Sequence, residues 1–235
     1  MKFIKYSSLL ILLITITLNA QNMSLFSKAT QSGWYPDFLS SVVNTIVADP
    51  KNKIILDIGT GPGTLPQMLI AENPAFQITG IDIDPSMIAE ANKRNSQQNI
   101  SFLIQQQNEK LPFSTSQFDV ITFCSVLFLL DDTTKKSLIE EALRVLKPEG
   151  KILILTPSGK KSIFSSFFEV WRYKFSFNNF TFPIWKIATT NSARKWQSQK
   201  WLKKYAERKA LTYSRLLTFN DNATLEIMSN NKIKM

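Results

Sequence analysis

The chain of 235 residues has room for one large domain, and 44% hydrophobic with 20% charged residues is typical of a globular protein. It has no histidine and a single cysteine, Cys124, which excludes Ser-His-Asp and Cys-His catalysis, zinc sites built on these residues and intrachain disulfides. The net charge is +10, and residues 160–215 carry thirteen Lys and Arg against Glu169 and Glu207, a balance of +11, so the rest of the chain is nearly neutral.

The chain begins with a hydrophobic leader, residues 1–22. Lys2 and Lys5 precede an apolar run over residues 6–18, which is the pattern of a secretory signal peptide. A helix of thirteen residues is too short to cross a bilayer core of about 30 Å. Two alternatives stay open: an upstream start codon, with Met23 as the true first residue, or a helix that associates with a membrane.

Strand and helix patterns alternate through the middle of the chain. Short apolar runs predict buried strands, and amphipathic patterns predict helices between them, the last one capped by Asp132 or Thr133. The expected strands are 53–58, 76–81, 100–104, 118–123 and 151–156, and the first two helices are 64–73 and 84–95. Residues 147–150 (KPEG) predict a type I turn. This alternation predicts an α/β fold with a parallel, doubly wound sheet.

The C-terminal part follows a different pattern. Residues 211–219 and 223–230 are strand-like, and the turn-forming residues 220–222 (NDN) join them. An antiparallel hairpin is therefore expected after the five parallel strands. The predicted sheet has seven strands, mostly parallel, with this hairpin at one end.

A glycine-rich loop follows the first predicted strand. Gly59, Gly61 and Gly63 stand two residues apart, and Asp57 lies two residues before the first of them. A turn from a strand directly into a helix needs positive φ and a bare backbone that a ligand can approach. A dinucleotide fingerprint requires G-x-G-x-x-G, but Thr64 occupies the last position, which disfavours an NAD site. The alternative is a purely structural glycine turn.

An acidic residue follows the second predicted strand at the distance expected for a ribose ligand. Asp82 stands about 20 residues after the loop, where a carboxylate can accept hydrogen bonds from both ribose hydroxyls. Alone, Asp82 could be a residue that caps a turn. Together, the loop and Asp82 predict a nucleoside site at the carboxyl ends of the first two strands.

Four segments resemble successive motifs of the class I S-adenosylmethionine-dependent methyltransferases, near their small-molecule and quinone or sterol branch. They are IILDIGTGPGTL (54–65), GIDIDPSMI (80–88), LPFSTSQFDV (111–120) and ALRVLKPEGKILIL (142–155). The resemblance implies a Rossmann-like fold, S-adenosylmethionine as cofactor, and one methyltransferase domain over residues 23–235. We expect no metal site, although the composition still allows Mg²⁺ or Ca²⁺ bound by carboxylates.

The resemblance also implies roles for individual residues. The three loop glycines would let the backbone hold the methionine part of the cofactor, with Asp57 near its charged end. Asp82 would bind the ribose and Ile83 would pack on the adenine. Gln107 and Asn108 match the adenine-contacting turn, although the family usually has an acidic residue where Gln107 stands. Ser125 would face the transferred methyl group.

Residues 158–201 form an aromatic and basic insert in this scheme. Thirteen of the 27 Phe, Trp and Tyr residues lie between residues 164 and 205. The resemblance implies an acceptor-binding cover here, for a small-molecule or lipid-like acceptor, whereas the alternative is a local core with solvated lysines. Residues 195–209 predict a basic amphipathic helix. It either touches anionic membrane or nucleic acid, or packs Trp196 and Trp201 on the sheet.

The preferred function is methyl transfer to a small-molecule or lipid-like acceptor. Without histidine, a general base would be a carboxylate, lysine, tyrosine or water. The alternative is a non-catalytic basic protein that keeps the fold and binds membrane or nucleic-acid surfaces. Nucleic acid is not expected as a substrate, because CSVLF follows the fourth strand in place of an Asn/Asp-Pro-Pro-aromatic motif. We expect a cytoplasmic protein, at most peripheral at the inner membrane face, because the methyl donor is an intracellular metabolite.

Overall fold

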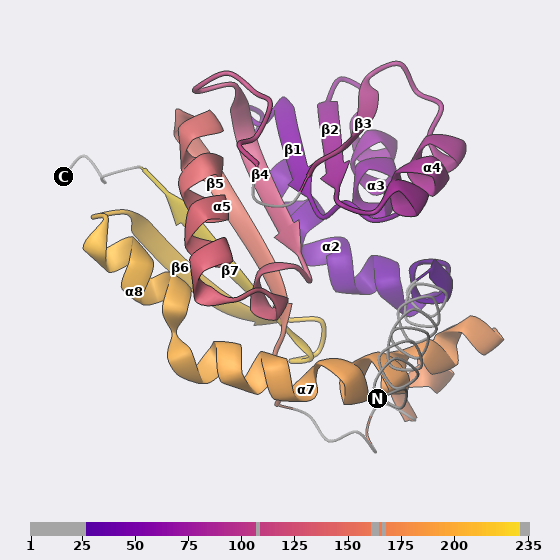
Figure 1. Ribbon diagram of the computed structural model, residues 1–235. Coiled ribbons are helices and arrows are strands. Elements are labelled where there is room, and N and C mark those ends of the chain that lie inside the picture. The colour runs from indigo at the N-terminus through magenta and orange to yellow at the C-terminus, as the bar shows by residue number, and fades with distance from the viewer. Residues whose placement is uncertain (1–26, 107–108, 161–164, 166–167, 231–235) are drawn as a thin grey trace, which may run out of the picture.

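A computed structural model describes residues 27–106, 109–160, 165 and 168–230 (Figure 1). The predicted leader, residues 1–22, lies outside the described residues. The described part contains a seven-stranded sheet in the order β3-β2-β1-β4-β5-β7-β6. The strands are β1 Ile54–Ile58, β2 Gln77–Asp82, β3 Ile100–Ile104, β4 Phe118–Cys124, β5 Leu146–Pro157, β6 Thr212–Thr218 and β7 Ala223–Ser229.

The strand directions confirm the predicted α/β fold class. Strands β1 to β5 pair in parallel, whereas β7 pairs antiparallel with both β5 and β6. In the β6–β7 turn, Asn220 and Asp221 have positive φ, a conformation that these two residue types tolerate better than most. The sheet is therefore Rossmann-like and doubly wound, with an antiparallel C-terminal hairpin.

Alternating side chains of the strands build two separate cores, one on each face of the sheet. Ile55, for example, packs into one buried cluster and Leu56 into the other, as a two-residue period requires. Helices α2 and α3 cover the first face, and α5 and α8 cover the second. The helices are α2 Trp34–Val47, α3 Thr64–Glu72, α4 Pro85–Arg94, α5 Asp132–Val145, α7 Thr181–Gln199 and α8 Trp201–Arg208.

Two local predictions were wrong. Helix α5 is capped by Asp131, whose Oδ1 accepts hydrogen bonds from the amides of Thr133 and Thr134, so the cap lies one residue before the predicted position. Residues 147–150 belong to β5 instead of a free turn. The pairing shifts from Phe118–Leu146 to Val120–Lys151, so these residues form an irregular bulge within the strand.

The predicted basic helix over residues 195–209 is two helices. Lys200 adopts a left-handed conformation (φ 50°) between α7 and α8 and turns the chain there. Trp196 is 3% exposed, and its Nε1 donates to Glu226 of β7 over 2.7 Å. This tryptophan therefore packs on the sheet, in agreement with the second interpretation of the segment.

Residues 168–201 of the predicted insert contain two 3-10 helices, η2 Val170–Arg172 and η3 Phe177–Phe180, followed by α7. In Figure 1 the arrows of β2 and β4 point down the view, toward α2 and α7. The insert thus lies on the side of the molecule toward which the parallel strands run. Among the described helices, none combines the length and apolarity needed to span a membrane.

Candidate functional site

The sheet has a topological switch point between β1 and β4. The chain runs from β1 outward to β2 and β3, and then returns to β4 on the other side of β1. In open α/β sheets, ligands bind in the crevice that this reversal leaves outside the carboxyl ends of the strands. A cavity of about 380 Å³ lies at this point, a size suited to a small molecule.

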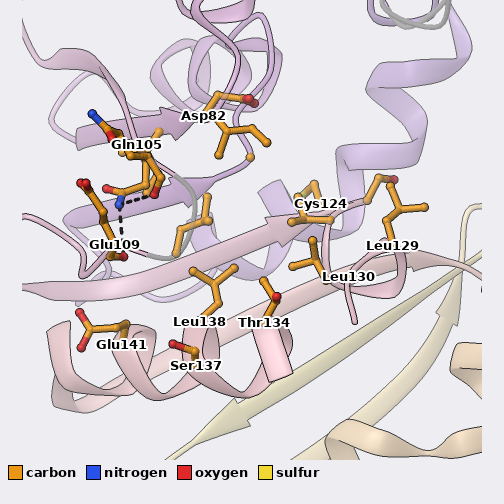
Figure 2. Close-up of a pocket in the computed structure, with 17 residues that line it drawn as sticks. Asp82, Gln105, Glu109, Cys124, Leu129, Leu130, Thr134, Ser137, Leu138 and Glu141 are labelled. Atoms are coloured by element: carbon orange, nitrogen blue, oxygen red, sulfur yellow. Dashed lines mark hydrogen bonds between the residues drawn. The ribbon is translucent and has the colours of Figure 1, made fainter. Parts of the chain in front are cut away.

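The cavity is lined by the ends of four strands and by one face of α5 (Figure 2). Figure 2 shows Asp82 and Gln105 on one side and Thr134, Ser137 and Leu138 on the other. The lining residues are Ile58, Gly59, Ile81, Asp82, Ile83, Gln105, Gln106, Glu109, Cys124, Ser125, Val126, Leu129, Leu130, Thr134, Ser137, Leu138 and Glu141.

The glycine loop is shaped by its own packing. Gly59 has φ +74°, and a Cβ on it would lie 2.3 Å from Cγ2 of Val126. Gly63 has φ +77°, and a Cβ there would lie 2.6 Å from Nδ2 of Asn95. Both positions therefore require glycine for conformation and for space. Of the three predicted loop glycines, Gly59 lines the cavity, whereas Gly61 and Gly63 do not.

The amides of these glycines are engaged within the protein. The amide of Gly59 donates to the carbonyl of Ile81 (2.8 Å), that of Gly61 to Oδ2 of Asp82 (2.9 Å), and that of Gly63 to the carbonyl of Thr60 (3.2 Å). The loop is thus fastened to the end of β2. A ligand bound at this loop would therefore need hydrogen-bond partners other than these three N–H groups.

Asp82 is held in a fixed orientation at the cavity edge. Its Oδ2 accepts from the Gly61 amide and its Oδ1 from the Asp84 amide (3.0 Å), which leaves further acceptor capacity on both oxygens. Burial raises the pKa of this carboxyl, while the backbone hydrogen bonds oppose the rise. The next residue, Ile83, is 62% exposed and also lines the cavity, so it offers an uncovered apolar surface beside the carboxylate.

Ser125 directly follows β4 and has an unusual environment. Its φ is 61°, and its amide donates to the carbonyl of Leu155 (2.9 Å). Its hydroxyl is buried and has no hydrogen-bond partner within the part of the chain that the structure describes. A buried, unpaired hydroxyl is costly unless a ligand satisfies it, so Ser125 is suited to contact a bound molecule.

Asp57 lies at the end of β1 and does not line the cavity. It is 2% exposed, and its Oδ1 accepts a hydrogen bond of 2.6 Å from the Thr122 hydroxyl. Burial raises the pKa of Asp57 to about 6, against the lowering effect of that hydrogen bond. The predicted adenine-contacting residues Gln107 and Asn108 lie outside the described residues, although their neighbours Gln106 and Glu109 line the cavity.

The contribution of α5 to the cavity was not predicted. Thr134, Ser137, Leu138 and Glu141 line it, and their spacing of three or four residues places them on one helix face. That polar stripe beside Leu138 is the signal in the sequence that could have pointed to them. Glu141 is paired with Arg144 (2.7 Å), and this hydrogen-bonded partner lowers the pKa of Glu141. The described residues contain no cluster of metal-ligating side chains.

Comparison with known proteins gives consistent matches to one kind of domain. A family model described as "Methyltransferase domain" matches residues 55–150. The ubiquinone/menaquinone biosynthesis C-methyltransferase of Desulfotalea psychrophila is 36% identical over 118 residues, which cover 49% of this chain and 47% of that protein. The protein of the same name from Rickettsia bellii is 31% identical over 167 residues, which cover 67% of this chain and 62% of that protein.

Solved structures agree with the fold. A protein from Methanococcus maripaludis superimposes with a TM-score of 0.67 at 23% identity, over 92% of this chain and 94% of that one. At this identity the likeness establishes the fold alone. The chain spans about half to two thirds of the length of the curated relatives it matches.

Proposed function

Because this chain belongs to the class I S-adenosylmethionine-dependent methyltransferases, we propose that it transfers a methyl group to a small, lipid-like acceptor. The observation that carries the proposal is the cavity at the switch point. There, a fixed carboxylate, an exposed isoleucine and a buried unpaired hydroxyl face the same space.

The residues of the cavity fit the cofactor of this family. Asp82 has free acceptor capacity for the ribose hydroxyls, and Ile83 offers an apolar face for the adenine ring. The orphaned hydroxyl of Ser125 gains a partner when a polar ligand enters the cavity. We therefore assign Asp82, Ile83, Ser125 and Gly59 to cofactor binding. Gly61 contributes indirectly, because its amide orients Asp82, and Gly63 contributes by allowing the turn into α3.

The chemistry asks mainly for orientation. The cofactor supplies a methyl group on a sulfonium, which is already activated toward a nucleophile. Holding two reactants in line can contribute up to about 7–11 kcal/mol to a reaction of this kind. The protein's part is thus to fix both molecules and to keep water out. Asp82, which the amides of Gly61 and Asp84 hold in one orientation, fixes the position of the nucleoside.

Two features support an apolar acceptor. The cavity lining around η1 (Leu127–Leu129) is apolar, with Val126, Leu129 and Leu130, and Leu138 is the apolar residue that α5 adds. The matched relatives from Desulfotalea psychrophila and Rickettsia bellii are named for quinone biosynthesis. A quinone-like or other lipid-like acceptor agrees with both. A cytoplasmic location, or a peripheral one at the inner membrane face, follows from the need for the methyl donor.

Calorimetric titration with S-adenosylhomocysteine tests the binding site. Asp82→Asn should weaken binding at least about tenfold, because a buried hydrogen bond to a charged group contributes about 1.5–3 kcal/mol. Asp84→Asn is the matched control, since Asp84 is the next acidic residue and its side chain caps α4 outside the cavity lining. We expect it to bind within about twofold of the wild type. Equal affinity of all three proteins would contradict the assignment of Asp82.

A second candidate function is that of a non-catalytic protein that binds anionic surfaces. The balance of +11 over residues 160–215 favours it. A screen of quinones, phenols, lipids and amines with labelled S-adenosylmethionine separates the two. Methyl transfer to any of them supports the enzyme. Cofactor binding without transfer, together with binding of RNA or vesicles beyond that of a charge-matched protein, supports the surface binder.

A further inference from the structure

The segment that joins β5 to α7 carries large aromatic side chains in solvent. Phe168, Trp171, Phe175 and Phe177, which we call the exposed aromatic segment, have exposed fractions of 77, 74, 75 and 81%. The rings of Phe175 and Phe177 contact each other, with centroids 5.5 Å apart. Four exposed rings within ten residues are far more than scattered surface hydrophobics, and such clusters mark interaction sites.

These rings are not needed for the local core. A separate set of aromatic side chains fills the space between α2, α7 and the β6–β7 turn. Trp34 and Phe182 are fully buried there with centroids 5.2 Å apart, and Phe219 is 8% exposed. Part of the insert's aromatic residues therefore form the local core that the alternative interpretation predicted, whereas the exposed aromatic segment does not belong to it.

The charged side chains between Trp171 and Phe177 are both positive, whereas Glu169 precedes them and Asp37 of α2 contacts Tyr173. Arg172 and Lys174 alternate with its rings and are exposed. Glu169 is the only acidic residue between positions 160 and 205, and its Oε2 accepts a hydrogen bond of 2.8 Å from Asn222. Aromatic rings interleaved with Lys and Arg suit the interface of an anionic bilayer, where the rings enter the headgroup region and the cations meet lipid phosphates.

The position of the segment adds a second argument. The amide of Gly33 donates to Oδ1 of Asn179 (2.8 Å), and Nε1 of Trp34 donates to Thr181 (3.0 Å), so the start of the described chain is fastened to η3 and α7 (Figure 1). The apolar run of residues 6–18 ends nine residues before Ser27. That distance spans at most about 30 Å of extended chain. The apolar run of the sequence is therefore joined to the described chain at a point close to η3 and α7.

We propose that the exposed aromatic segment, with Arg172 and Lys174, docks on the surface of an anionic lipid bilayer. The cavity lining and the aromatic core next to the segment share one buried cluster, since Cys124, Trp34 and Phe182 all belong to it. We infer that the docking serves to deliver a lipid-like acceptor, and this purpose rests on the proposed function. The docking itself does not, because it requires neither cofactor nor turnover.

A probe on the segment tests the contact directly. Phe177→Cys in the full chain is labelled with an environment-sensitive dye, because Cys124 is buried. Leu217→Cys on β6 is the matched control, at an apolar residue 37% exposed on the edge of the sheet. With vesicles of phosphatidylcholine and phosphatidylglycerol, we expect a blue shift at position 177 and none at 217. A protein that binds the vesicles while the dye at position 177 stays in water would overturn the proposal.

Charge variants test the role of the cations. Arg172→Ala with Lys174→Ala should weaken vesicle binding about thirtyfold, because each basic side chain near an anionic surface contributes about fivefold. Lys203→Ala with Lys204→Ala removes the same charge from α8 and should change binding less than about threefold. Equal loss in both pairs would overturn the proposal in favour of a diffuse charge effect.

Two further results would also overturn the proposal. One is a blue shift at position 177 that grows with protein concentration without vesicles, which would identify a second copy as the occupant. The other is tighter binding to a single-stranded oligonucleotide than to vesicles. Titration with S-adenosylhomocysteine on the same samples keeps the two proposals apart, because failure of the membrane contact leaves cofactor binding intact.

Discussion

Asp57 is a carboxyl group buried at the end of β1, beside the proposed cofactor site. Burial raises its pKa from 3.8 to about 6, although the Thr122 hydroxyl donates to it. The native protein therefore holds this proton more tightly than the unfolded chain does. Its contribution favours folding below pH 3.8 and is lost as the pH rises through about 6, because ionisation then occurs in a site that water does not reach.

Replacing Asp57 should remove this pH dependence. Asp57→Asn keeps an acceptor for Thr122 but has no charge to bury, so the free energy of unfolding at pH 8 should rise by up to about 3 kcal/mol relative to the wild type. At pH 4 the two proteins should differ little. Urea denaturation at a series of pH values measures this. Asp84→Asn, at the half-buried cap of α4, is the control variant. If Asp57→Asn has the same slope of unfolding free energy against pH as the wild type, Asp57 is not the source of that slope.

At the level of elements, Lys200 is the residue that separates α7 from α8. Its left-handed conformation lets α8 turn back so that Leu202 and Tyr205 reach the core beside α5. On α5, Lys135 then lies over both tryptophans that flank the break, with Nζ 5.5 Å from the Trp196 ring and 5.7 Å from the Trp201 ring. A non-glycine residue in this conformation costs roughly 1 kcal/mol.

Glycine at this position should therefore stabilise the protein. We expect Lys200→Gly to raise the free energy of unfolding by about 0.5–1 kcal/mol, because glycine adopts positive φ without a steric cost. The same change at Lys203, inside α8, should lower it by about 1 kcal/mol. Urea unfolding of both variants makes the comparison. A loss of stability in both would mean that the lysine side chain at position 200 contributes more than its backbone strain costs.

The break at Lys200 also shows where prediction from sequence ends. The positions of the strands along the chain depend on local patterns, so most of the strands and the position of Asp82 could be predicted. The continuous pattern over residues 195–209 contains no glycine or proline, and tertiary packing alone imposes the break. For the same reason α5 was not predicted at the cavity, since its polar stripe acquires a meaning only when the chain returns across the sheet.

At the scale of the whole molecule, one buried side chain links the insert to the sheet. Asn222, in the β6–β7 turn, is 2% exposed. Its Nδ2 donates to Glu169 before η2 (2.8 Å), and its Oδ1 accepts from Lys186 of α7 (3.0 Å). Its backbone carbonyl also accepts from the Ser158 amide at the end of β5 (2.9 Å). The segments that enter and leave the exposed aromatic segment are thereby fixed to the sheet through this residue.

Asn222→Ala should loosen the insert without opening the cavity. Both hydrogen bonds to buried or half-buried charged groups are lost, at a cost of about 1–3 kcal/mol, so local opening around η2 should become roughly tenfold more frequent. Limited trypsinolysis measures this as faster cleavage after Arg172 and Lys174 relative to Arg94. Affinity for S-adenosylhomocysteine should stay unchanged, because Asn222 does not line the cavity. Asn92→Ala, on an exposed face of α4, is the control and should retain the wild-type cleavage pattern. If Asn222→Ala instead accelerates cleavage equally at all sites, Asn222 stabilises the whole fold and not the docking of the insert.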